Sequence, residues 1–205
     1  MPADRPSVAV IGCGAIAREL LVIAGQPGLE HLVVECLPAR LHNTPWLIPQ
    51  AVEERIVAAR ARGSEVYVAY GDCGTGGQLD TVLEDHGVDR LPGDHCYQFF
   101  LGGAAFLAEH DENPATFYLT DYLVRHFDRL VWSGLGIDRH PQLLADYFGN
   151  YQRVLYLAQV EDPSLVAEAR SHAARLGLDF AHRVAGYGDV EPALLRLGGV
   201  REPAA

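Results

Sequence analysis

Four cysteines are the side chains of this sequence best suited to do chemistry, because a thiolate is both a nucleophile and a ligand for soft metals. They are Cys13, Cys36, Cys73 and Cys96 of a 205-residue chain, and no two of them form a CxxC pair. That spacing excludes a zinc ribbon and a thioredoxin motif. A metal site in this chain must therefore be assembled from segments that lie far apart in the sequence.

Three of the cysteines stand beside glycine or histidine, Cys13 immediately after the first predicted strand and Cys73 and Cys96 in polar loops. Cys13 lies in IGCGAIA, Cys73 in YGDCGTGG and Cys96 in GDHCY. We predict that these three thiols bind a metal ion, with zinc or iron the best match to the ligand type and an iron–sulfur cluster as an alternative. Cys36 lies inside an apolar run and is expected to be a core residue.

The glycines of the Cys73 loop have a predicted role of their own. Gly71 and Gly74, with Gly76 and Gly77, would let the backbone turn tightly around the thiol and offer N–H donors to an anionic ligand. The cofactor-binding residues predicted from this loop are Gly71 and Gly74.

Histidine would complete the predicted site. His42 and His95 lie in loops, and either would supply a fourth ligand or transfer protons. Glu19 is the third candidate for a catalytic role. Four other polar side chains are expected to line the same pocket: Tyr70, Asp72, Asp121 and Arg125.

The elements that must position these residues alternate between strands and helices. Strand-like runs are predicted over residues 7–12, 31–36, 65–70, 153–160 and 178–185. This alternation predicts an α/β fold with a mostly parallel, Rossmann-like sheet and helices on both faces. The length suits a single domain over residues 1–205, with loose termini at about 1–6 and 199–205. The carboxyl ends of parallel strands share one edge of the sheet. Cys13, Cys36 and Cys73, which lie at or just after the ends of the first three predicted strands, are therefore expected to meet there.

Charge excludes several classes of function. The net charge is −11, and all sixteen basic residues are arginine. Nucleic acid is not an expected partner, because no basic stripe is present. Schiff-base and P-loop chemistry need a lysine and are excluded.

No apolar run is long enough for a membrane span, and the start MPADRPSVAVIG has no signal-peptide pattern, so we expect a cytoplasmic protein that does not bind membranes.

A dinucleotide-binding interpretation competes with the metal site. VAVIGCGAIARE matches G-x-G-x-x-A through Gly12, Gly14 and Ala17, after a strand and before a helix. Glu35 stands at a suitable distance to bind a ribose hydroxyl. An oxidoreductase that binds NAD(P) therefore stays open as an alternative, as does a non-catalytic module that binds a metal or small molecule.

A centre with three thiolates would be electron-rich and a poor activator of water. It suits the activation of a thiol or the transfer of an alkyl group on a small molecule. The apolar helix predicted over residues 97–110 contains LGGAAFL, whose small residues would allow packing in a homodimer.

Several short motifs, taken in order, resemble the DUF1638 family of prokaryotic proteins. They are CGAIAREL (13–20), LHNTP (41–45), YGDCG (70–74), GDHCY (93–97) and FYLTDYLVRHF (117–127). The resemblance implies that Cys13, Glu19, His42, Cys73, His95 and Cys96 are the motif positions. It also implies, by analogy with some members of the family, a corrinoid or methyltransferase partner.

Overall fold

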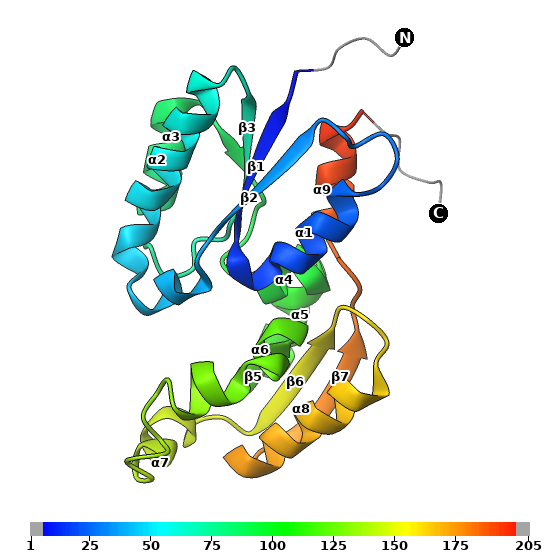
Figure 1. The fold of residues 1–205 in the computed structure, drawn as a ribbon. Helices are drawn as coiled ribbons and strands as arrows, with labels where there is room; N and C mark the ends of the chain where they lie inside the picture. Colours follow the sequence, from blue (N-terminus) through cyan, green and yellow to red (C-terminus); the bar gives the residue numbers. More distant parts are fainter. Residues whose placement is uncertain (1–5, 200–205) are drawn as a thin grey trace. The chain divides into compact units, whose positions relative to one another are not determined.

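The computed structural model describes residues 6–199, which form two compact units (Figure 1). The first contains the described residues up to Phe99 and from Tyr187 onward, and the second is Phe100–Gly186. Each unit has its own parallel sheet with helices between the strands. The α/β class and the parallel pairing predicted from the sequence are confirmed, and the strands divide between two sheets. The loose termini predicted at about 1–6 and 199–205 fall almost entirely outside the described residues.

The sheet of the first unit is built around β1 (Val8–Cys13), which is buried along its whole length. The strand order is β2-β1-β3-β4, and all pairs are parallel. The other strands are β2 (Leu32–Leu37), β3 (Glu65–Ala69) and the short β4 (Asp89–Arg90). An apolar strand such as VAVIGC suits the centre of a sheet that is covered on both faces.

Helices cover both faces of this sheet, with α1 and α9 on one side and α2 and α3 on the other (Figure 1). The helical segments of the unit are η1 (Gly14–Ile16), α1 (Ala17–Ala24), η2 (Ala39–Asn43), η3 (Pro45–Leu47), α2 (Ile48–Ala61), α3 (Gln78–His86), α4 (Cys96–Leu101) and α9 (Val190–Leu197). Helix α2 buries Val52, Ile56 and Ala59, which repeat at the spacing of one helical face. Each fully buried Ile of this kind contributes roughly 1.5–3 kcal/mol to folding.

The strand order reverses direction in the middle of this sheet. The chain leaves β1 to form β2 on one side of it, and then returns to form β3 and β4 on the other side. Such a reversal leaves a crevice outside the carboxyl ends of the two strands concerned, here β1 and β3, where α/β proteins commonly bind ligands.

The second unit has a three-stranded parallel sheet in the order β5-β6-β7. Its elements are α5 (Gly103–Glu112), β5 (Thr116–Thr120), α6 (Asp121–Arg125), the π-helix η4 (Asp128–Trp132), α7 (Leu143–Phe148), β6 (Arg153–Ala158), α8 (Pro163–Leu176) and β7 (Asp179–Val184). Its core joins Phe127, Tyr156 and Ala169, among others. The apolar helix predicted over 97–110 is two helices, because Gly102 adopts a φ of 85° and ends the first.

None of the helices in residues 6–199 is long and apolar enough to cross a membrane.

Candidate functional site

Cys13 is the last residue of β1, at the point where the sheet order reverses. The thiol is buried, and its Sγ accepts a hydrogen bond from the Ala15 N–H at 3.3 Å, which caps η1. A Cβ on Gly14 would lie 2.9 Å from the Leu37 carbonyl oxygen and 3.2 Å from the Ala39 nitrogen. Only glycine therefore lets the turn after β1 come this close to the segment after β2.

That close approach brings His42, in η2, to Cys13. The His42 Nδ1 lies 3.9 Å from the Cys13 Sγ and 2.9 Å from the Ala39 carbonyl oxygen. The shorter contact assigns the proton to Nδ1, which donates to Ala39, and leaves the lone pair on Nε2. Desolvation and the neighbouring His95 lower the pKa of His42, although its bond to Ala39 opposes them. The ring is therefore neutral at pH 7 and free to accept a proton or a metal ion.

Asp72 organises the glycine-rich loop that follows β3. Its carboxylate accepts hydrogen bonds from the N–H groups of Gly74, Gly76 and Gly77 at 2.8–3.2 Å. It also accepts one from the Thr75 hydroxyl at 2.5 Å. The N–H of Gly74, predicted to face an anionic ligand, thus donates to a side chain of its own loop.

A second loop holds Cys73 from the other side. The Cys73 N–H donates to the Asp94 carbonyl oxygen at 2.8 Å, and the Asp72 N–H donates to the Gly93 oxygen at 3.3 Å. A Cβ on Gly71 would lie 2.8 Å from the same Asp94 oxygen. Cys73 has a φ of 50°, the one positive value outside glycine in the part of the chain that the structure describes. This strained backbone and the bond to Asp94 hold Cys73 beside the loop that leads to Cys96.

Tyr70 lies among the three predicted metal ligands. It follows β3, is fully buried, and its ring stacks on His42 with the ring centres 5.8 Å apart. Its hydroxyl acts electrostatically on the thiols of Cys13, Cys73 and Cys96. The hydroxyl is buried, and its hydrogen-bond partner is the Cys13 thiol.

The electrostatics of the thiols show that they share one environment. Burial, and then the neighbouring Cys13, raise the pKa of Cys73 to about 12. Burial, Cys73 and Cys13 raise the pKa of Cys96 well above its usual range. Burial also raises the pKa of Cys13, although the Ala15 N–H and Tyr70 oppose it. The three thiols therefore influence one another electrostatically, and burial keeps them neutral at pH 7 unless a cation joins them.

The donor set fits a soft metal, since thiols and imidazole are the ligands of zinc and iron(II). The side chains are not already closed around one point, however. Among residues 6–199, no group of three or more His, Cys, Asp or Glu side chains has an arrangement that could hold a metal ion as it stands. Metal binding would thus require the thiols to turn toward one another.

The remaining predicted positions, His95 and Glu19, belong to the first unit as well. His95 precedes α4, and its ring centre is 4.9 Å from that of Tyr97. Desolvation lowers the pKa of His95, against the charges of Asp94 and Asp72. Glu19 is buried on the first turn of α1. Its catalytic role stays a prediction.

The residues of the dinucleotide-binding motif have structural roles. A Cβ on Gly12 would lie 2.3 Å from the Leu20 Cδ1, so this glycine lets α1 pack closely on β1. Glu35 forms ion pairs with Arg62 and with Arg55. Gly14 faces the backbone that follows β2. The dinucleotide-binding role of these residues stays a prediction.

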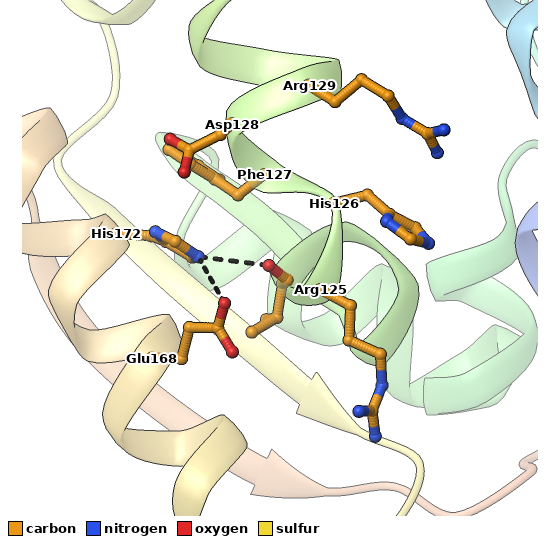
Figure 2. Close-up of a pocket in the computed structure, with 8 residues that line it drawn as sticks. Arg125, His126, Phe127, Asp128, Arg129, Glu168 and His172 are labelled. Carbon is orange, nitrogen blue, oxygen red and sulfur yellow. Dashed lines mark hydrogen bonds and ion pairs between the residues drawn. The ribbon is translucent and has the colours of Figure 1, made fainter.

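The second unit contains an open pocket of about 250 Å³ between the α6–η4 segment and α8 (Figure 2). Its buried His172 donates from Nε2 to the Val124 carbonyl oxygen at 3.2 Å and stacks on Phe127 at 4.0 Å. Figure 2 shows the guanidinium groups of Arg125 and Arg129 pointing away from His172. The Glu168 carboxylate also lies 3.7 Å from Nε2, so the histidine is held by Val124, Glu168 and Phe127 of its own unit.

Asp121 and Arg125, which were expected near the cysteines, belong to the second unit. Asp121 is buried, and its Oδ1 accepts hydrogen bonds from the Tyr156 hydroxyl at 2.6 Å and the Gln159 N–H at 3.0 Å. The Asp121 N–H donates to the Gln159 side chain at 2.7 Å. This network joins the ends of β5 and β6. It was not predicted, because no local signal pairs residues 35 or more positions apart.

Comparison with known proteins gives one family. Residues 36–194 match the family described as "Protein of unknown function (DUF1638)", and the chain belongs to that family. The match includes Cys73, His95 and Cys96, whereas Cys13 and Glu19 precede it. No curated protein and no solved structure matches the chain.

Proposed function

We propose that this DUF1638 protein is a metal–thiolate protein whose first unit binds one zinc or iron(II) ion through Cys13, Cys73 and Cys96. The proposal is supported by the electrostatic interaction of three thiols from three separate segments, one of them at the end of β1, where the sheet order reverses. All four cysteines of the chain are free thiols, as a thiolate site requires. Free thiols also fit the expected cytoplasmic location.

His42 is the group best placed to serve the metal or its ligand. Its Nδ1 proton is engaged by the Ala39 carbonyl oxygen. Metal-binding histidines commonly donate their other ring N–H in this way, which fixes the ring orientation. Nε2 would then be the fourth ligand or the acceptor of a proton from a bound small molecule.

Thiolate ligands also suggest the class of reaction. Three thiolates leave little positive charge on the metal, so the centre is a poor activator of water and a better partner for a soft sulfur ligand. We therefore propose activation of a thiol, or alkyl transfer to one, as the chemistry of the site.

The testing experiment is metal analysis of protein purified without oxygen and without an affinity tag. We expect about one zinc or iron ion per chain, and a loss of most of it in Cys73→Ser and in Cys96→Ser. Cys36→Ser is the matched control. Cys36 pairs in register with Gly12, whereas Cys13 pairs with Leu37, so the two side chains leave the sheet on opposite faces even though their thiols interact electrostatically.

Two results would contradict the proposal. One is protein with intact thiols and no stoichiometric metal. The other is equal loss of metal in Cys36→Ser and Cys73→Ser, which would place the metal elsewhere or trace the loss to general misfolding. Circular dichroism of each variant distinguishes a lost ligand from a lost fold.

A further inference from the structure

Strand β7 of the second unit is an edge strand with an exposed end. In the part of the chain that the structure describes, the sheet ends at β7, and β6 is its one neighbour (Figure 1). The strand pairs with β6 over six residues in unbroken register, and residues 182–184 are exposed. Natural edge strands are protected from further pairing by proline, by bulges or by charged side chains. Strand β7 has only the charges, on Asp179 and Arg183.

The backbone of β7 directs alternate residues toward this free edge. Asp179 and Ala185 donate their N–H groups to carbonyl oxygens of the β6 segment, at 3.1 Å and 2.9 Å. The backbone groups of successive residues in a strand point to opposite sides, so the odd-numbered residues of β7 face β6. The N–H and C=O groups of Phe180 and His182 therefore point away from β6, where another strand could pair with them.

The side chains of β7 are complementary to the same strand running in the opposite direction. Asp179 and Arg183 lie two positions before and two positions after Ala181. In an antiparallel pair with Ala181 opposite Ala181, each Asp179 therefore lies opposite an Arg183, and each Phe180 lies opposite a His182. A shift of the register by one or two residues removes the match between the opposite charges.

Both charged side chains can take part in such a pair. Asp179 is exposed. The Arg183 side chain is half exposed and forms an ion pair with Glu109 at 3.5 Å. A guanidinium group has five N–H donors, so Arg183 can bind a second carboxylate as well.

We infer that β7 pairs with β7 of a second copy of this chain, in an antiparallel arrangement centred on Ala181. The two copies would be joined by backbone hydrogen bonds, two for each of the two pairs of Phe180 with His182. Their three-stranded sheets would become one continuous sheet, and the contact would use the same residues on both copies. This inference does not depend on the proposed metal site.

The other edge strands of the described residues fit a second copy less well. Strand β5 is largely buried, and β4 has two residues. Strand β2 carries one charged residue, Glu35, which is already paired with Arg62 and Arg55. Among these edges, β7 combines length and exposure with charges that match when the strand is reversed.

The test is sedimentation velocity of the full-length protein over a series of concentrations. A contact confined to one strand edge buries little surface, so we expect a weak dimer with a Kd on the order of 10 μM. Exposed ion pairs add little affinity, but they decide which register and which partner are accepted. The most informative variants are therefore those that change the charges.

Two charge-reversal variants test the register. Asp179→Arg and Arg183→Asp each place two like-charged pairs across the contact, so each variant alone should associate about tenfold more weakly than the wild type. An equimolar mixture of the two should dimerise again, because one variant has only arginine and the other only aspartate at these two positions. Recovery in the mixture also shows that both variants are folded.

A second pair of variants tests the backbone hydrogen bonds. His182→Pro removes an N–H that points to the free edge and leaves the pairing with β6 intact, so it should abolish the dimer. His182→Ala keeps this N–H and should retain most of the association.

Three results would overturn the inference. One is a wild-type protein that stays monomeric at roughly 100 μM, well above the expected Kd. Another is a dimer that Asp179→Arg, Arg183→Asp and His182→Pro leave unchanged, because its interface would then lie on another surface. The third is an equimolar mixture of the two charge variants that stays monomeric, which would exclude the register centred on Ala181.

Discussion

The carboxylate of Asp72 controls the shape of the loop that carries Cys73. Four donors of this loop converge on it, three of them backbone N–H groups. Partial burial would raise the pKa of Asp72, but the Thr75 hydroxyl and the glycine N–H groups outweigh it and lower the pKa. The loop contains four glycines and forms no helix or strand, so the hydrogen bonds to this one side chain define its conformation.

Replacing this carboxylate should loosen the loop. We expect Asp72→Ala to lower the free energy of unfolding by about 1–3 kcal/mol, because the donors lose their shared acceptor. It should also weaken metal binding. Urea unfolding and metal analysis measure the two effects.

Asp85→Ala, an exposed position on the neighbouring α3, is the control and should change neither quantity. The lowered pKa adds a pH dependence with a definite sign. The stability that Asp72 contributes is present above the unfolded-state pKa of 3.8 and is lost as the pH falls through the folded-state pKa. A variant as stable as the wild type at pH 7 would disprove this role for Asp72.

At the scale of elements, the site depends on the contact between the loop after β3 and the loop that precedes α4. Two backbone hydrogen bonds join these loops, from Asp72 to Gly93 and from Cys73 to Asp94. Gly71 has no room for a side chain at this contact. The loop that carries Cys73 and the loop that leads to Cys96 can therefore lie this close only because residue 71 has no Cβ.

Adding that methyl group should separate the loops. We expect Gly71→Ala to lose most of its bound metal, since its Cβ would overlap the Asp94 carbonyl oxygen, a backbone atom that cannot turn aside. The measurement is metal content together with the midpoint of urea unfolding.

Gly63→Ala is a demanding control for this substitution. Gly63 has a φ of 78°, and a Cβ added to it would meet no other atom within 4 Å, so alanine there introduces backbone strain without a clash. It should cost about 1 kcal/mol of stability and leave the metal in place. Equal metal loss in the two variants would show that stability alone governs metal binding.

At the scale of the whole molecule, the buried thiols link stability to pH. Burial and the neighbouring Cys13 raise the pKa of Cys36 to about 11 and that of Cys73 to about 12, from 9.0 in the unfolded chain. Between these values the unfolded chain has lost protons that the folded protein still holds. The contribution to stability is therefore complete below pH 9 and declines as the pH rises toward 12.

We expect the urea midpoint of the metal-free protein to fall steadily between about pH 9 and about pH 11, the range set by the shifted thiols. The decline should be shallower in Cys73→Ala, which lacks one of these thiols. The half-buried Tyr67, whose pKa burial raises from 10.0, adds to the decline from about pH 10 upward. A midpoint that does not change over this range would show that the thiols are not buried in solution.

Much of this protein followed from the sequence alone. The alternation of apolar strands and amphipathic helices established the parallel α/β fold, because residue periodicity reports directly on which faces are buried. The positions of Cys13 and Cys73 at strand ends were enough to predict that they meet, since parallel strands end at one edge. The glycines marked the turns where backbones approach closely, as at Gly14 and Gly71.

Only the tertiary structure decided which strands are neighbours. Periodicity is a local property, and it does not say that β5 pairs with β6 in a second sheet or that the first sheet reverses at β1. Such choices depend on contacts between residues far apart in the chain. For the same reason, the hydrogen bonds from the glycine N–H groups to Asp72, and the one between Tyr70 and Cys13, became visible only in three dimensions, where each polar group can be matched to its partners.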